Sequence, residues 1–299
     1  MKTGETYVAS GKFEFPKVII ATLVGIVATS ILGVIYAVIS EINPFIYLQI
    51  LVLAGLFIAL SFIIRKILRF AKSRNVMVNL IVGLIICFFA WYAHWCFYYV
   101  KYAYDMSFLA AFFNPVGTFQ FIKDFSEVRT ITISNAGRSN GPEISGIFLQ
   151  ICYLIEFAVF MYTSFAHRKP EYFSEEHQCF YTPVEVYVEK NEAFDEAFDK
   201  APRGNYNFLS KIEIYHTPNE IMLEQGAKIV KLEFNHCEGG KDDSILTMIE
   251  GKLKVEKKKK ERSFSSGKKL IEGIYVNEAT DEAILRTNVT PENIPSENN

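Results

Sequence analysis

One carboxylate lies inside an otherwise uncharged apolar stretch. Glu156 is the single charged residue of the run 144–166. An acidic side chain near mid-membrane costs about 2.5–3.5 kcal/mol even on the lowest scales, so such residues usually face the interior of a helix bundle and often mark an ion path. No Lys or Arg lies within any of the long apolar stretches. We therefore expect Glu156 to be neutral and hydrogen-bonded to Thr29 or Ser30, with a proton or cation role as the alternative.

Two further polar side chains within the apolar stretches are candidates for an intramembrane polar site. They are His94, in the run 76–100, and Gln150, in the same run as Glu156. At the helical rise per residue, counted from the basic side of the membrane, His94 would lie roughly 27 Å deep, Gln150 roughly 24 Å and Glu156 roughly 15 Å. The sequence therefore predicts that Gln150, and not Glu156, is the partner of His94.

Two histidines and two cysteines in the C-terminal half have the side chains of a tetrahedral zinc site: His177, Cys179, His236 and Cys237. Their spacing matches no recognised ligand pattern, and adjacent residues of a strand point to opposite faces. We predict no metal and no cofactor, and we expect both cysteines to be free thiols in a reducing compartment. The sequence has no Gly-rich phosphate loop, HExxH, GxSxG or kinase-type motif set, which argues against an enzyme.

A basic cluster lies near the C-terminus. The segment 252–269 has nine basic and two acidic residues, including the run Lys257, Lys258, Lys259 and Lys260. The simplest interpretation is the solvated tip of a hairpin. The functional alternative is docking on anionic lipid headgroups, where each basic residue contributes about 1 kcal/mol. Nucleic acid is not expected as a partner, because aromatic residues do not interleave with the basic ones.

Charge and hydropathy divide the chain of 299 residues into two unlike parts. Residues 1–166 carry 12 of the 31 Lys and Arg and 8 of the 33 Asp and Glu, so the two parts have net charges of +4 and −6. A helix needs about 20 apolar residues to cross a bilayer. Four stretches meet this length, which predicts a four-helix transmembrane domain followed by a soluble domain: 18–40, 44–64, 76–100 and 144–166.

Basic residues indicate the orientation of these spans, because Lys and Arg near span ends favour the cytoplasmic side. The connection after Ile64 has five of them within ten residues, and the first connection has none. This pattern predicts both termini on the cytoplasmic side of a bacterial-type inner membrane, with residues 101–143 outside. The run 106–122 is apolar but interrupted by Asn114 and Pro115, which favours a surface-lying or re-entrant segment with a helix opening at Pro115. A fifth span there would move the soluble domain outside.

Two patterns within the spans bear on packing. Small residues recur every fourth position of the first span and predict a closely packed face, against 54–59 of the second span or against a second copy of the chain. Aromatic residues crowd 91–99, which indicates an interfacial belt, or an inward-facing cage as the alternative. The five small residues are Ala21, Gly25, Thr29, Gly33 and Ala37.

The segment 167–286 predicts a small cytoplasmic α+β domain rich in antiparallel strands. Alternating apolar residues indicate strands at 183–189, 211–216, 228–235, 244–255 and 270–276, and a helix is expected over 191–201. Residues 287–299 are polar and expected to be disordered.

Three functional hypotheses follow from this organisation. The first is a membrane-anchored scaffold, sensor or regulatory subunit that acts through its soluble domain. The second is a small transporter or channel that uses Glu156. The third is a membrane enzyme with a site at the outer interface near His94. The expected partners are the lipid bilayer and either a second copy of the chain or another membrane subunit.

Overall fold

The computed structural model describes residues 3–43, 46–103, 106–132, 143–237, 240–256 and 261–285. They form two compact units. One comprises Ser10–Pro170, and the other combines Met1–Ala9 with Glu171–Asn299. The N-terminal segment therefore belongs to the same unit as the C-terminal half of the chain. The lysine run 257–260 and the predicted disordered segment 287–299 lie outside the described residues.

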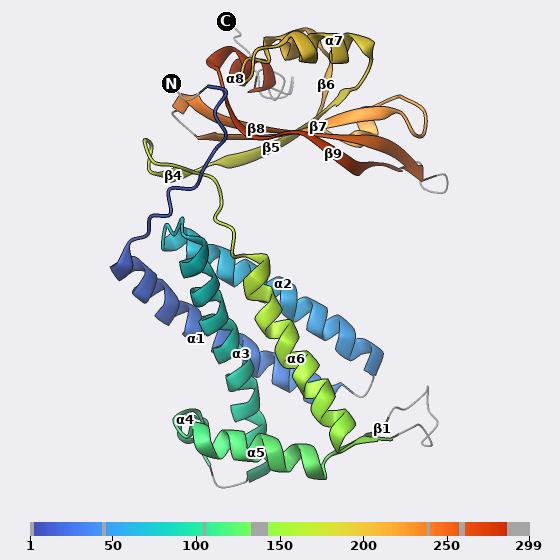
Figure 1. The fold of residues 1–299 in the computed structure, drawn as a ribbon. Helices are drawn as coiled ribbons and strands as arrows, with labels where there is room; N and C mark the ends of the chain where they lie inside the picture. The colour runs from blue at the N-terminus through green and yellow to red at the C-terminus, as the bar shows by residue number, and fades with distance from the viewer. Residues whose placement is uncertain are drawn as a thin grey trace, which may run out of the picture. The chain divides into compact units, whose positions relative to one another are not determined.

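The first unit is a polytopic helical bundle, as the sequence predicts (Figure 1). Four of its described helices are long and apolar enough to cross a membrane. The second continues past its predicted end at Ile64 because Arg65, Lys66 and Arg69 have long apolar stems that suit a helix emerging from lipid. The four helices are α1 (Phe15–Ile42), α2 (Ile46–Phe70), α3 (Val76–Ala103) and α6 (Ile147–Ala166).

The small-residue face of α1 packs against α3. A Cβ atom on Gly33 would lie 2.0 Å from the carbonyl oxygen of Ala90, and one on Gly25 would lie 2.6 Å from Ile86 Cδ1. All five small residues of this face are buried. The predicted packing of this face against 54–59 of α2 was wrong. Gly55 is exposed, and a Cβ there would meet no atom within 4 Å.

The segment between α3 and α6 forms two short helices. These are α4 (Phe108–Phe112) and α5 (Pro115–Val128), followed by the hairpin of β1 (Thr130–Thr132) and β2 (Glu143–Ser145). The break falls at Asn114, whose side chain accepts a hydrogen bond from Gly117 N at 3.0 Å. At 1.5 Å per residue, α5 is about 21 Å long and too short to cross a bilayer core of about 30 Å.

The aromatic residues near the end of α3 face inward, and the predicted interfacial belt is wrong for them. Trp91, Tyr92, Trp95 and Tyr98 are all buried, and Trp95 is 0% exposed. The Tyr92 hydroxyl donates to the Phe112 carbonyl at 2.9 Å. The reason is tertiary: α4 and α5 cover this end of α3, which one helix's sequence does not reveal.

The second unit is an α+β domain with an antiparallel five-stranded sheet in the order β6-β5-β7-β8-β9. Helices α7 and α8 lie on the same side of the sheet (Figure 1). Apolar residues of the sheet form one buried cluster with residues of α7, α8 and the short helix η1. Phe194 of α7 and Ile284 of α8 are buried against Val186 and Leu232. The elements are β3 (Phe173–Ser174), β4 (Cys179–Phe180), β5 (Thr182–Glu189), α7 (Glu192–Lys200), η1 (Asn207–Lys211), β6 (Ile214–Tyr215), η2 (Pro218–Glu220), β7 (Lys228–Cys237), β8 (Gly240–Glu256), β9 (Glu261–Val276) and α8 (Glu278–Leu285).

Strands β8 and β9 form a long hairpin that extends beyond the predicted strands. The pairing runs from Ser244↔Val276 to Glu256↔Glu261. Residues 261–269 are largely polar and exposed, so they pair through their backbone without an alternating apolar pattern.

Candidate functional site

The N-terminal segment lies along β9 as an additional edge of the sheet. Thr6 forms an antiparallel bridge with Ile274. Gly4 N donates to the Tyr275 carbonyl at 2.9 Å, and Tyr7 N donates to the Gly273 carbonyl at 2.7 Å. The open edge of β9 is therefore covered at Gly273 to Tyr275, near its C-terminal end, by residues that precede the first membrane helix.

Tyr7 also contacts the connection that follows α6. Its hydroxyl donates to the Phe173 carbonyl at 3.4 Å and accepts from Phe173 N at 3.2 Å. Its ring packs edge-on against Tyr172, with centroids 4.9 Å apart. One side chain thus joins the segment that enters α1 to the segment that leaves α6.

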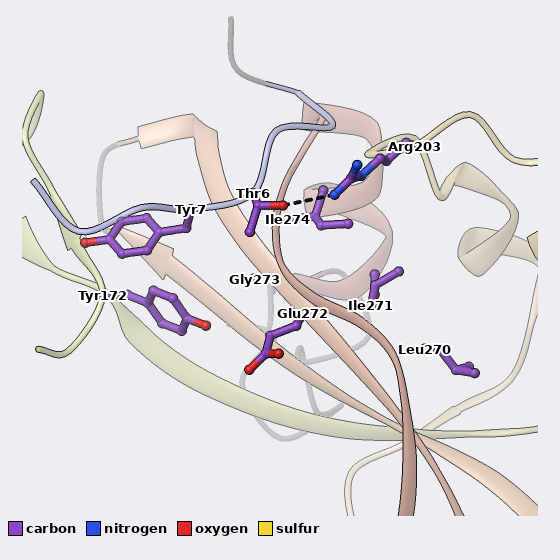
Figure 2. Close-up of a pocket in the computed structure, with 9 residues that line it drawn as sticks. All are labelled: Thr6, Tyr7, Tyr172, Arg203, Leu270, Ile271, Glu272, Gly273 and Ile274. Atoms are coloured by element: carbon purple, nitrogen blue, oxygen red, sulfur yellow. Dashed lines mark hydrogen bonds between the residues drawn. The ribbon is translucent and has the colours of Figure 1, made fainter. Parts of the chain in front are cut away.

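A cavity of about 650 Å³ lies at this junction (Figure 2). Arg203 Nη2 donates to Thr6 Oγ1 at 2.9 Å on its wall. Glu272 supplies a carboxylate and forms an ion pair with Lys269. Gly273 has a φ of +58°, and a Cβ there would lie 3.0 Å from Tyr172 Oη, so a side chain would crowd the site. The volume falls within the range of small-molecule sites, and the walls offer charges of both signs and two tyrosine rings. The lining residues are Thr6, Tyr7, Tyr172, Arg203 and Leu270 to Ile274.

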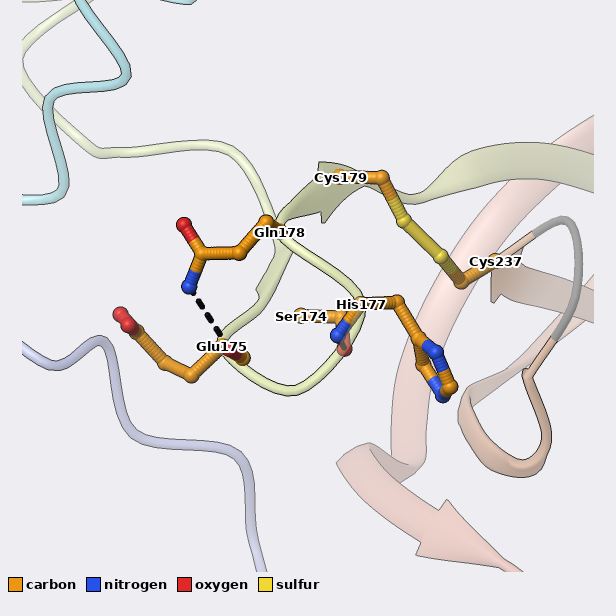
Figure 3. Close-up of a disulfide and its surroundings, with 6 residues drawn as sticks. All are labelled: Ser174, Glu175, His177, Gln178, Cys179 and Cys237. Atoms are coloured by element: carbon orange, nitrogen blue, oxygen red, sulfur yellow. Dashed lines mark hydrogen bonds between the residues drawn. A yellow bond between two sulfur atoms is a disulfide. The ribbon is translucent and has the colours of Figure 1, made fainter.

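Cys179 and Cys237 form a disulfide with a Cα–Cα distance of 6.8 Å (Figure 3). The expectation of two free thiols was wrong, because it rested on an assumed compartment and ignored that β4 brings Cys179 beside the end of β7. Sulfur atoms bonded to each other are unavailable as zinc ligands. Among the described residues, no group of three or more His, Cys, Asp or Glu is placed to hold a metal. His177 lies in the exposed turn before Cys179, and His236 precedes Cys237 on β7.

Glu156 belongs to a chain of hydrogen bonds that joins three membrane helices. Tyr36 Oη of α1 donates to Glu156 Oε1 at 2.5 Å. Gln49 Nε2 of α2 donates to Tyr36 Oη at 3.0 Å and to Ser40 Oγ at 2.8 Å. The hydroxyl partner differs from the expected one, since Thr29 donates instead to the carbonyls of Gly25 and Ile86, at 2.9 and 3.0 Å.

His94 lies beside this chain among aromatic rings. It is 2% exposed, and its ring centroid is 5.1 Å from that of Tyr36 and 5.0 Å from that of Tyr98. The predicted pairing with Gln150 was wrong, because Gln150 Nε2 donates to Ser126 Oγ of α5 at 3.2 Å. In the part of the chain that the structure describes, His94 Nδ1 is buried without a hydrogen-bond partner.

An ionic cluster lies at the C-terminal end of α1. Glu41 accepts from Lys101 Nζ at 2.7 Å and from Tyr102 Oη at 2.8 Å, and Arg129 Nη2 is 3.8 Å from its second oxygen. The Arg129 guanidinium also lies over the Phe125 ring, 5.0 Å from its centroid. These contacts tie the end of α5 to α1 and α3.

The residues around the 650 Å³ cavity escaped the sequence analysis. Thr6, Tyr7 and Val8 are strand-favouring types, which is the local signal that was present. The signal was weak because this short run lies 268 positions from its bridge partner Ile274. Comparison with protein-family models, with curated proteins and with solved structures gives no match for this chain.

Proposed function

We propose that this membrane protein is a sensor or regulatory subunit that acts through its soluble domain. The observation that carries the proposal is the junction at Tyr7. Two chain segments connect the domain to the bundle, one entering α1 and one leaving α6, and both line the same cavity. A small molecule bound there would contact both connections at once.

In this proposal, ligand binding is coupled to docking of the N-terminal segment, because the ligand has a higher affinity for the docked state than for the released state. A ligand shifts an equilibrium only as far as its affinities for the two states differ. The N-terminal segment is held by a few hydrogen bonds at a sheet edge, and such edges are among the first elements to open locally. A ligand that contacts Thr6 and Tyr7 binds only when the segment is docked, and it therefore stabilises the docked state.

We also propose that the domain lies on the cytoplasmic side of a bacterial inner membrane. The contacts of residues 4–7 with β9 support an even number of crossings, because the chain before α1 and the chain after α6 must share a side. Lys12 and Gly11 accept hydrogen bonds from Arg74 N and Asn75 Nδ2 in the basic connection between α2 and α3. Basic connections favour the cytoplasmic side. Docking of the lysine run 257–260 on anionic lipid is a further part of this proposal.

Cysteine accessibility tests the orientation. The native cysteines are first replaced by serine. A single cysteine is then placed at Lys72, Lys123 or Glu192, and intact cells are treated with a membrane-impermeant thiol reagent. We expect labelling at Lys123 alone, and labelling of all three after the cells are opened. Labelling of Glu192 in intact cells would place the domain outside and end the cytoplasmic part of the proposal.

A pair of glycine variants tests the coupling. A Cβ at Gly4 would lie 2.7 Å from the Arg203 carbonyl oxygen, so Gly4→Val should detach the segment. Gly11 also has a positive φ but meets no atom within 4 Å, so Gly11→Val is the matched control. Amide hydrogen exchange of the full chain in lipid nanodiscs should speed up at Tyr7, at Tyr275 and in the first turn of α1 for Gly4→Val only. If amide exchange in α1 were unchanged, detachment of the N-terminal segment would have no effect on the bundle, and the proposed coupling would be wrong.

The second candidate is a proton or cation transporter that uses Glu156. The hydrogen-bonded chain from Gln49 through Tyr36 to Glu156 favours it, since linked polar groups within a bundle can relay protons. Purified protein in liposomes with a pH-sensitive dye separates the candidates. Flux that Glu156→Gln abolishes would favour transport, and its absence in the wild type favours the regulatory subunit.

A further inference from the structure

The disulfide joins β4 to the end of β7, next to the pair Thr182↔His236 at which the β5–β7 ladder ends. Cys179 begins β4, in the connection that leaves α6, and Cys237 ends β7. The β3–β4 hairpin has the ladder pairs Phe173↔Phe180 and Ser174↔Cys179, continued by a hydrogen bond from Tyr181 N to the Tyr172 carbonyl at 3.2 Å. A hairpin this short is marginal on its own. The disulfide therefore anchors the hairpin to the end of the sheet.

The same disulfide lies within the cluster that holds the N-terminal segment. Cys237 is buried together with Tyr181, Ile245 and Tyr275. Tyr7, Tyr172 and Cys179 pack against these residues. Tyr7 is linked to this arrangement, because its hydroxyl donates to the carbonyl of Phe173 and accepts from the N–H of Phe173 in the anchored hairpin. The disulfide thus packs in the same cluster as Tyr7 and Tyr172, which form the contact between the two connections.

Accessibility differs between the two sulfur-bearing residues. Cys237 is 4% exposed, whereas Cys179 is only half-buried at the edge of the exposed turn 175–178. An external thiol therefore reaches Cys179 more readily than Cys237.

We propose that Cys179 and Cys237 form a reversible thiol–disulfide switch that controls docking of the N-terminal segment. The inference rests on the cytoplasmic placement proposed above, since disulfides in reducing compartments are usually transient and redox-sensing. The ligand class is a low-molecular-weight thiol and its disulfide.

The exchange proceeds in two balanced steps. In reduction, a small-molecule thiolate attacks Cys179 Sγ, forms a mixed disulfide and releases Cys237 as a thiolate, which takes up a proton. A second small thiolate attacks the sulfur of the small molecule in the mixed disulfide, which frees Cys179 and leaves one small-molecule disulfide. Two electrons pass from two small thiols to the protein, and oxidation is the reverse.

Reduction should release the hairpin and, with it, the segment that leads into α1. Without the anchor, Phe173 no longer holds the Tyr7 hydroxyl in place. The hydrogen bonds from Gly4 and Tyr7 to β9 then open more often. The oxidised chain is the docked state, and the reduced chain is the released state.

The test uses the full chain in lipid nanodiscs with Cys152→Ser, which removes the exposed free cysteine. Samples are equilibrated in mixtures of reduced and oxidised glutathione, and their free thiols are alkylated. Mass spectrometry then gives the fraction of chains in which the disulfide is reduced. Amide exchange at Tyr7 and Tyr275 is measured in parallel. We expect reversible conversion between the two states and at least tenfold faster exchange at Tyr7 in the reduced state.

Cysteine variants separate the switch from general unfolding. Cys179→Ser and Cys237→Ser should exchange like the reduced chain in every mixture, and exchange at Val230 in the middle of the sheet should stay slow. A bond that glutathione never reduces, thiols that never oxidise, or unchanged exchange at Tyr7 after full reduction would each overturn the switch. These results do not depend on orientation, which the labelling of Glu192 tests separately.

Discussion

Replacing Gly33 by alanine should be one of the most damaging small changes in the bundle. The new Cβ would lie 2.0 Å from the Ala90 carbonyl oxygen and 2.9 Å from its carbon, whereas ordinary contacts begin near 3.4 Å. The helices must therefore separate by about 1.4 Å at this point, because both clashing atoms belong to the backbone of α3 and cannot rotate away.

The magnitude follows from two opposing effects. Overpacking of this kind costs about 1–3 kcal/mol, and a rigid backbone neighbour places Gly33→Ala at the upper end. Alanine returns roughly 0.5–1 kcal/mol through its better helix propensity. We expect a net loss of about 2 kcal/mol, which lowers the folded-to-unfolded ratio by roughly thirtyfold.

Thermal unfolding of the purified chain in detergent measures this loss. Gly55→Ala is the matched control, because Gly55 lies in α2 and a Cβ there would meet no atom within 4 Å. It should be neutral or slightly stabilising. If Gly33→Ala were as stable as the wild type, the close approach of α1 and α3 would be wrong. A variant that kept its stability but lost oligomers would point to a seam between copies instead.

Two further predictions concern ionisable side chains. Glu156→Gln should fold like the wild type, whereas Glu156→Leu leaves the Tyr36 hydroxyl without its acceptor and should destabilise the bundle by about 1–3 kcal/mol; equal tolerance of both in thermal unfolding would contradict a buried structural role. In the soluble domain, burial disfavours the Lys190 ammonium, but hydrogen bonds to Glu250 and Asp195 outweigh it and raise the pKa of Lys190. Its contribution to stability should be complete below about pH 10.4 and be lost as pH rises through the higher folded pKa. Urea unfolding followed by circular dichroism should therefore show that Lys190→Met destabilises the domain at pH 7 and much less above the folded pKa, and an equal loss at both would refute the ion pairs.

The four membrane helices could be predicted because hydropathy is a local property. Each stretch of apolar residues satisfies its own backbone as a helix whatever its neighbours are. The strands at 183–189 and 228–235 were predictable for a similar reason, since the residues that face the main core, such as Val186, Val188 and Val230, are apolar at every second position. The burial of Tyr187 and Ile229 in a second cluster was not predictable in this way. The first half of β9 was not, because residues 261–269 lack a consistently buried face.

Contacts between side chains within the bundle were harder to predict than which residues lie in each span. Glu156 is visible in the sequence as a charge among apolar residues, but its partner Tyr36 is not. Counting depth from the ends of spans assumes that all helices start in one plane and stand upright, and it pointed to Thr29 or Ser30, whereas the residue of α1 that meets Glu156 is Tyr36. The inward position of Trp95 likewise depends on α4 and α5, which are short and cover α3 only through tertiary packing.

The pairing of Thr6 with Ile274 has a consequence for biosynthesis. The N-terminal segment leaves the ribosome before its partner strand, because Ile274 is made 268 residues after Thr6. At about 5–20 residues per second, this interval lasts roughly 10–50 s, during which all four spans can enter the membrane. The segment stays unpaired until β9 exists, so its docking marks a chain in which β9 has been made and has folded. A nascent or truncated chain that ends before β9 would instead keep a free N-terminal segment.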